Sequence, residues 1–240
     1  DYKIGYKSPY RHLDRLTRVY EYMGPAWYQR EIEIPAAWKG KRIFLYFERT
    51  HWLSSVYVGK EEVSKIDYIS IPHNHELTQW LHPGKKELIT FCIDNRYQYD
   101  THKWDHAHSE FTQINWNGVL GEIKLVAVDP VYVDDMQVYP DIKNKSIKVK
   151  MTVRNCTEHT ASGKISFHVT GKDYRLQKEV PVTVTDSITY IEEEMFLGKD
   201  IHLWNEFHPN LYTLDCKLTS SVEGQSYAHE KSTTFGMREV

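Results

Sequence analysis

The segment from Trp104 to Asn117 carries the densest set of side chains that could bind a ligand. Its letters, WDHAHSEFTQINWN, bring imidazole, carboxylate, amide and indole groups together. Such groups form hydrogen bonds or stack on rings, and burying all of them without partners would cost free energy. The segment is therefore a candidate ligand platform. Its candidate binding residues are Trp104, His108, Glu110, Asn115 and Trp116.

The histidines are the first candidates for metal ligands, but their spacing matches no zinc signature. His102, His106 and His108 stand near Asp105 with spacings that a metal site could use, yet no cysteine lies close to them. The run His73-Asn74-His75 allows the same comparison. A polar surface loop is the preferred interpretation of both groups, so we expect no metal and no other cofactor.

No arrangement of residues typical of catalysis is recognisable. The sequence has neither the G-x-S-x-G element of a serine hydrolase nor a phosphate-binding glycine loop. Acidic clusters occur at Glu61-Glu62, Asp134-Asp135 and Glu192-Glu193-Glu194, but such runs usually lie in solvent. Glycoside hydrolysis needs two carboxylates about 5–10 Å apart, and nothing marks such a pair. We therefore expect that this chain is not catalytic by itself.

Some tryptophans could contribute a ring on which a sugar stacks. Trp52, Trp104 and Trp116 lie in or beside expected loops, where an indole face can reach a ligand. A position in the core is the default for each of them. Trp27 opens an expected strand, and we predict that it is buried.

Composition restricts the class of protein. The 240 residues include 30 basic and 33 acidic ones, and the net charge of −3 leaves no electrostatic footprint for nucleic acid or an anionic membrane. No apolar run approaches the ~20 residues that span a bilayer. The chain starts with Asp1 instead of Met, so we expect a piece of a longer protein, whose compartment (periplasmic, extracellular or cytoplasmic) stays open. Free structural thiols are expected at Cys92, Cys156 and Cys216.

Short strands separated by turn residues must position these side chains. One helical turn is expected at Glu76–Leu81, where Pro83-Gly84 breaks it. Short strands with almost no helix predict a β-sandwich. The expected strands of the first half are Trp27–Ile34, Arg42–Glu48, Ser55–Val58, Leu88–Ile93 and Glu122–Val128.

After Pro130 apolar and polar residues alternate more regularly. Ile147–Val153 is the clearest case, with one face for the core and one for water. About seven such strands in ~110 residues is the count of an immunoglobulin-like domain, and the absence of the Cys–Trp–Cys spacing excludes an antibody-type domain. We therefore predict an all-β chain: a jelly-roll β-sandwich at residues 1–129, then an immunoglobulin-like β-sandwich at residues 130–240.

A series of motifs follows this order of strands. Each one is short and unspecific, but their order and spacing together are distinctive. They are Gly24–Arg30 (GPAWYQR), Phe47–Val63, Leu81–Leu88 (LHPGKKEL), Asn115–Ile123 (NWNGVLGEI), Leu203–Leu214 and Phe235–Val240 (FGMREV).

This series resembles the front end of glycoside hydrolase family 2, which includes β-galactosidases, β-glucuronidases and β-mannosidases. The sequence departs from the pattern of the family at three points. Gly59 follows Val58 without the usual Asn, Glu87 replaces an Asn, and Gly121 replaces an Arg. The resemblance nevertheless covers nearly the whole chain.

The resemblance implies roles for both halves of the chain. The first half would be the sugar-binding domain of the family and the second its immunoglobulin-like domain. The catalytic acid/base and the nucleophile, both Glu, would lie in a (β/α)₈ barrel after residue 240. In β-galactosidases and β-glucuronidases, a loop just before the motif at Asn115–Ile123 sends an acidic residue toward the sugar. Glu110 matches it best by position.

We therefore predict the non-catalytic N-terminal portion of a β-glycosidase that hydrolyses O-glycosidic bonds in carbohydrates. It would resemble a β-galactosidase more than a β-glucuronidase, and would be inactive without the barrel. Its partners would be the carbohydrate substrate and its own barrel, with neither nucleic acid nor a membrane, and a homo-oligomeric parent stays open. The alternatives are a stand-alone carbohydrate-binding or adhesion module and a structural spacer.

Overall fold

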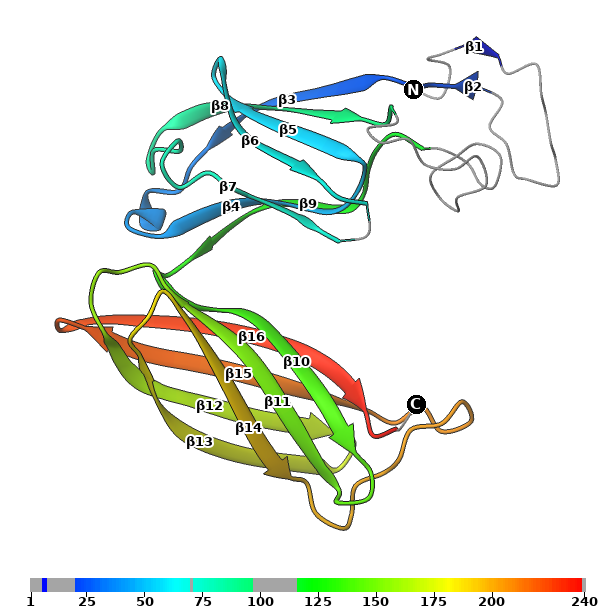
Figure 1. Cartoon of the computed structure of the whole chain (residues 1–240), viewed down its shortest axis with the longest axis vertical. Coiled ribbons are helices and arrows are strands. Elements are labelled where there is room, and N and C mark those ends of the chain that lie inside the picture. Colours follow the sequence, from blue (N-terminus) through cyan, green and yellow to red (C-terminus); the bar gives the residue numbers. More distant parts are fainter. Residues whose placement is uncertain (1–5, 8–19, 70, 97–115, 239–240) are drawn as a thin grey trace. The chain divides into compact units, whose positions relative to one another are not determined.

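The structure is a computed structural model that describes residues 6–7, 20–69, 71–96 and 116–238 (Figure 1). The chain divides into two compact units, Asp1–Ala127 and Val128–Val240. We call them unit 1 and unit 2 and describe each by itself. Within the described ranges, no helix is long and apolar enough to cross a membrane.

Unit 1 is built from two sheets. One has four strands in the order β3-β8-β5-β6, and the other has three in the order β7-β4-β9. The neighbours in the four-stranded sheet pair antiparallel, as do β4 and β7. The strands are β3 (Pro25–Glu33), β4 (Arg42–His51), β5 (Leu53–Val58), β6 (Glu61–Asp67), β7 (His73–Glu76), β8 (Lys86–Asp94) and β9 (Gly118–Val128), beside a short pair, β1 (Tyr6–Lys7) and β2 (Tyr20–Glu21), and the 3₁₀ turn η2 (Ala36–Trp38).

The core of unit 1 lies between these two sheets. Buried side chains come from β4 (Ile43, Leu45 and Phe47) and from the four-stranded sheet (Val56 and Ile93). The buried residues of β4 alternate with half-buried ones, because successive side chains of a strand point to opposite faces. Burial of apolar surface between the sheets is the main favourable term for such a sandwich.

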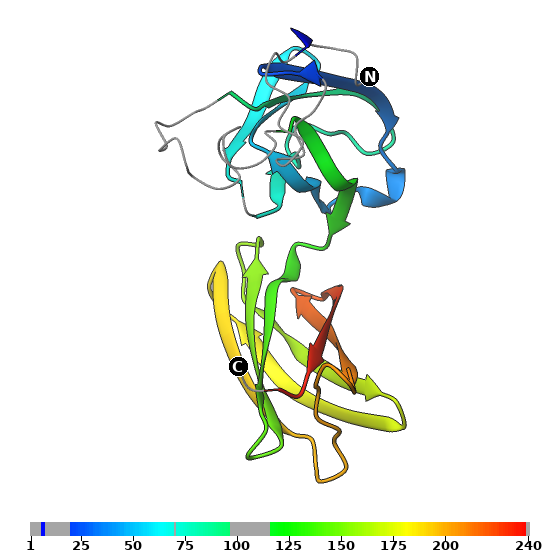
Figure 2. The same cartoon turned by 90° about the vertical axis from the view of Figure 1, so that its right-hand side faces the viewer.

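Unit 2 has seven strands in two sheets, which face each other across its core (Figures 1 and 2). The order is β10-β11-β14 in one sheet and β13-β12-β15-β16 in the other, with every pair antiparallel. This is an immunoglobulin-like arrangement. The strands are β10 (Val131–Asp141), β11 (Ser146–Asn155), β12 (Ala161–Gly171), β13 (Tyr174–Val184), β14 (Ile188–Phe196), β15 (Leu211–Val222) and β16 (Gln225–Gly236).

The predicted alternation is found in unit 2. Ile147, Val149, Met151 and Val153 of β11 are all buried, and the residues between them are half-buried or exposed. Phe167 of β12 is fully buried in the same core. The predicted all-β fold, a jelly-roll-like sandwich followed by an immunoglobulin-like one, is confirmed.

Trp27 is a correction, because its side chain is 59% exposed. The next residue, Tyr28, stacks on Phe91 of β8 with ring centroids 4.8 Å apart. Neighbouring residues of a strand point to opposite faces, so the Trp27 ring lies on the outer face, 5.6 Å from the ring of Tyr57. The position of a residue at the start of a strand does not determine which face it occupies.

The expected helical turn at Glu76–Leu81 is shorter than predicted. Glu76 still belongs to β7, and a hydrogen-bonded turn follows in which the N–H groups of Trp80 and Leu81 both donate to the carbonyl of Leu77, at 2.9 and 3.1 Å. Leu77 and Leu81 are buried in the core of unit 1. The apolar spacing of Leu77 and Leu81 therefore belongs to a single turn whose leucines pack into the core, and not to a helix.

Candidate functional site

The predicted binding residues divide into one that the structure describes and four that it does not. Trp116 lies just before β9 and is half-buried. Trp104, His108, Glu110 and Asn115 lie outside the described residues, as does the group His102, His106 and Asp105. The described part of the candidate site is therefore the set of residues around Asn95 and Trp116, on either side of residues 97–115, which we call the frame.

The amide of Asn95 joins three separate parts of the chain in this frame. Its Oδ1 accepts a hydrogen bond from the N–H of Gly24 at 2.9 Å. Its Nδ2 donates to the carbonyls of Tyr22 at 2.9 Å and Trp116 at 3.2 Å. Asn95 is fully buried, so each of these bonds satisfies a group that water does not reach. The amide thus joins Asn95 and Trp116 to the segment that precedes β3.

Asn117 adds a second amide at the same place. Its Nδ2 donates to the carbonyl of Gly24 at 2.7 Å. Its Oδ1 is buried and has no hydrogen-bond partner among the described residues. A buried acceptor of this kind is expected to find a donor.

Two aromatic residues at the end of β4 complete the frame. His51 Nδ1 donates to the carbonyl of Trp116 at 2.9 Å, and its ring lies 5.1 Å from the Trp116 ring. The indole N–H of Trp52 donates to the carbonyl of Arg96 at 2.9 Å. Trp52 is only 4% exposed, so it is a core residue. Of the predicted stacking residues that the structure describes, Trp52 and Trp116, only Trp116 could present ring surface to a ligand.

Asp94 and Arg96 form an ion pair beside this frame. The guanidinium of Arg96 donates to the carboxylate of Asp94, with Nε 3.0 Å from each oxygen, and the Arg96 backbone N–H donates to it as well. Burial alone would raise the pKa of the Asp94 carboxyl, but the bonds from Arg96 outweigh burial and hold the pKa below its usual range. Asp94 is therefore an ionised anchor for the strand end and a poor general acid.

His73 and His75 form a buried chain of hydrogen bonds inside unit 1. The carbonyl of Tyr68 can only accept, so His73 Nε2, 2.9 Å away, carries the proton. His73 Nδ1 then accepts from the Ser54 hydroxyl at 2.6 Å. Ser54 in turn accepts from His75 Nε2 at 2.8 Å, and His75 Nδ1 accepts from Ser64 at 2.8 Å. All four ring nitrogens have partners in this chain.

Both imidazoles are therefore neutral structural groups at neutral pH. Burial lowers the pKa of His73, and burial together with the neighbouring His73 lowers the pKa of His75 to about 3. Neither ring has a nitrogen free for a metal. Across the parts of the chain that the structure describes, no group of three or more His, Cys, Asp or Glu side chains could hold a metal ion.

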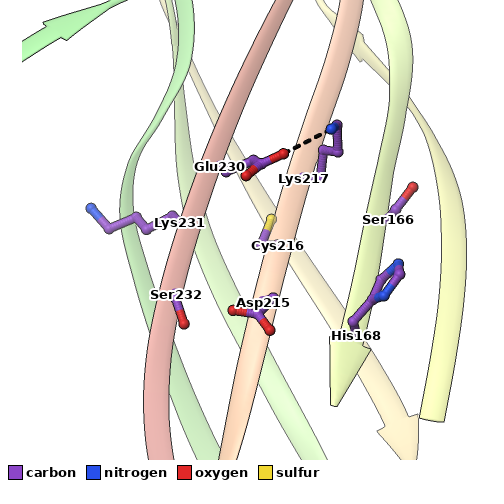
Figure 3. Close-up of a pocket in the computed structure, with 8 residues that line it drawn as sticks. All are labelled: Ser166, His168, Asp215, Cys216, Lys217, Glu230, Lys231 and Ser232. Carbon is purple, nitrogen blue, oxygen red and sulfur yellow. Dashed lines mark hydrogen bonds and ion pairs between the residues drawn. The ribbon is translucent and has the colours of Figure 1, made fainter. Parts of the chain in front are cut away.

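Unit 2 contains a pocket of about 300 Å³ (Figure 3). Lys217 of β15 donates to Glu230 of the neighbouring strand β16 at 2.7 Å. This bond lowers the pKa of Glu230, while burial raises the pKa of the Cys216 thiol to about 12. The cavity therefore offers hydrogen-bonding groups, but Cys216 is no nucleophile and Glu230 is no general acid near pH 7. Its lining residues are Ser166, His168, Asp215, Cys216, Lys217, Glu230, Lys231 and Ser232.

The buried pair generates a prediction about pH and stability. Because the pKa of His75 is about 3 in the folded chain and about 6.5 when unfolded, the unfolded chain binds more protons between these values. The contribution of the neutral ring to the free energy of unfolding should be fully present above about pH 6.5. Below that pH the free energy of unfolding should fall by up to about 1.4 kcal/mol per pH unit for each such histidine. Unfolding in urea at pH 8 to 5 measures this slope.

The control for this prediction is His75→Gln, which removes one titrating ring. Its unfolding free energy should depend less steeply on pH below about 6.5 than that of the original chain. Parallel curves for the two proteins would contradict the assignment. Histidine NMR gives an independent check, since the His75 ring should show no protonation step between pH 8 and 5.

A second prediction concerns the frame. Asn95→Ala should destabilise unit 1 by about 2–4 kcal/mol, because it leaves the buried N–H of Gly24 and two carbonyls without their partner. Asn74→Ala is the matched control, since Asn74 is exposed on β7 and its loss should cost less than about 0.5 kcal/mol. Urea unfolding followed by tryptophan fluorescence measures both. Equal midpoints for the two variants would show that the Asn95 amide does not hold the frame.

Comparison with known proteins identifies β-galactosidases and β-glucuronidases as relatives. Residues 131–238 match the family model described as "Glycosyl hydrolases family 2". The chain is 22% identical to a β-galactosidase of Thermoanaerobacter pseudethanolicus, covering 85% of this chain and 27% of that protein. It is 21% identical to a β-glucuronidase of Paenibacillus borealis, covering 92% of this chain and 38% of that protein. The chain thus spans well under half the length of these relatives.

Solved structures agree on the fold. A glycosyl hydrolase family 2 member from Bacteroides cellulosilyticus superposes with a TM-score of 0.72 and 18% identity, over 91% of this chain and 29% of that one. A β-glucuronidase from Bacteroides uniformis superposes with a TM-score of 0.73 and 16% identity, over 90% and 26%. The resemblance indicated by the motifs is therefore confirmed, and residues 131–238 match the model of glycoside hydrolase family 2.

Proposed function

We propose that this chain is the non-catalytic β-sandwich portion of a family 2 β-glycosidase. In this proposal unit 1 is a sugar-binding domain, unit 2 an immunoglobulin-like support, and the catalytic carboxylates belong to a barrel that follows residue 240. The observation that carries the proposal is the match of residues 131–238 to the family, in a chain whose motifs keep the order and spacing of the family from Gly24 onward.

The frame around Asn95 supports a role for residues 97–115 in binding substrate. A loop that contributes to a substrate site must have its ends held in place, because small displacements of a positioning group reduce turnover strongly. The buried amides of Asn95 and Asn117 supply such anchors. In our proposal Glu110 accepts hydrogen bonds from sugar hydroxyls, and His108, Asn115, Trp116 and Trp104 complete its surroundings.

We propose a β-galactosidase-like specificity before a β-glucuronidase-like one. The relatives include both kinds of enzyme. A β-galactoside and a β-glucuronide separate these alternatives by direct assay of the full-length protein, since the two sugars differ in configuration at C4 and carry a hydroxymethyl group or a carboxylate at C5. A preference for the glucuronide would reverse this part of the proposal and leave the family assignment unchanged.

The Glu110 role predicts a defined loss in the full-length enzyme. Glu110→Ala should lower kcat/KM by about 10- to 100-fold, because a hydrogen bond to a charged group contributes about 1.5–3 kcal/mol and each 1.4 kcal/mol is a factor of ten. Glu110→Gln should recover part of the loss, since its amide oxygen can still accept. Glu61→Ala, an exposed carboxylate on β6, is the control. Unchanged kinetics in Glu110→Ala would remove Glu110 from the site.

The alternative of a stand-alone carbohydrate-binding module differs in affinity. Good small-molecule sites bury most of their ligand. If the barrel forms part of the sugar site, the 240-residue chain without it encloses less of the sugar. We therefore expect the 240-residue chain to bind galactose-type monosaccharides with a Kd in the millimolar range or weaker. Calorimetry on this chain tests it, and micromolar binding would favour the module.

A further inference from the structure

The loop between β14 and β15, residues 197–210, exposes large apolar side chains. The side chain of Phe207 is 82% exposed and that of Leu203 48%, and Leu211, the first residue of β15, is 57% exposed. Burying a side chain of this size stabilises a protein by about 1.5–3 kcal/mol. Clustered exposure of apolar residues on an otherwise folded domain marks a site of interaction.

The tip of this loop is held by its own hydrogen bonds. Asn205 Oδ1 accepts from the N–H groups of Phe207 at 3.0 Å and His208 at 2.7 Å. The backbones of Asn205 and His208 also bond to each other in both directions, at 3.1 and 3.2 Å. Asn210 Nδ2 donates to the carbonyl of Leu203 at 2.9 Å. Phe207 is therefore presented to solvent by a closed turn, which lowers the entropic cost of binding.

The last described residues of the chain run along the same loop (Figure 1). The N–H of Trp204 donates to the carbonyl of Met237 at 3.0 Å, and the Arg238 guanidinium lies 4.5 Å from the centre of the Trp204 ring. A Cβ on Gly236 would lie 3.0 Å from side-chain atoms of Trp204, so the two residues are in close contact. Any polypeptide that follows residue 240 must start beside this loop.

We propose that the 197–210 loop is the docking surface for the polypeptide that follows residue 240, with the Phe207 ring seated in an apolar pocket of that polypeptide. The proposal rests on the proposed function in one respect, that the protein continues past residue 240. The coverage of 27% and 38% of the relatives' lengths supports such a continuation. The position of the loop beside the chain exit selects this occupant over a second copy or an unrelated protein.

The test compares the full-length protein with the 240-residue chain. Phe207→Asp should lower the Tm of the full-length protein by about 4 °C or more, because it places a charge in an apolar contact. The same change should alter the Tm of the 240-residue chain by less than about 1 °C. Tyr190→Asp is the matched control, since Tyr190 is an aromatic residue of β14 that is 78% exposed, and it should lower neither. Hydrogen exchange of residues 203–211 should be slower in the full-length protein.

The docking proposal is overturned if Phe207→Asp lowers the Tm of the full-length protein and of the 240-residue chain equally, or lowers neither. It is also overturned if the 240-residue chain forms a Phe207-dependent dimer in sedimentation, because a second copy would then be the occupant. A coding sequence that stops at residue 240 would overturn it as well. Glycosidase assays of the full-length protein separate the two proposals. If the full-length protein is inactive but Phe207→Asp lowers its Tm selectively, only the glycosidase proposal is refuted. If it is active and Phe207→Asp has no such selective effect, only the docking proposal is refuted.

Discussion

The candidate site depends on one buried amide. Asn95 bonds to Gly24, Tyr22 and Trp116, which come from the start of β3, the segment before it and the segment that leads into β9. Backbone groups at strand ends lack ladder partners, and leaving them buried and unpaired is costly. A side chain with both a donor and an acceptor can satisfy several of them at once. The positions of Tyr22, Gly24 and Trp116 relative to one another therefore depend on the hydrogen bonding of Asn95.

The buried polar residues of unit 1 show how environment decides chemistry. A histidine pair at spacing x1 could bind a metal, but each nitrogen of His73 and His75 already has a partner in a chain that runs from Ser64 to Tyr68. Desolvation then favours the neutral rings. The same side chains in an open loop would titrate near neutral pH and could bind cations. Burial converts a possible ligand set into core structure.

Unit 2 combines a buried apolar core with an exposed loop that is held by its own hydrogen bonds. Its core residues come from alternate positions of long antiparallel strands, which leaves the outer face polar. The 197–210 loop departs from this pattern, since Leu203 and Phe207 are exposed although Asn205 and Asn210 hydrogen-bond to the backbone around them. Local order together with outward apolar groups is the physical signature of an interface.

The sequence by itself determined the class of fold and the resemblance to the family. Alternation in Ile147–Val153 predicts burial because a strand has period two whatever it packs against, and the motif order needs no three-dimensional knowledge. Only the tertiary structure decided that Trp27 faces outward, that Trp52 is core, and that His73 and His75 are neutral. These outcomes depend on partners distant in sequence, such as Asn95 and Gly24, which no local pattern specifies. The roles of Trp104, His108, Glu110 and Asn115 remain predictions from the sequence, because those residues lie outside the described part of the chain.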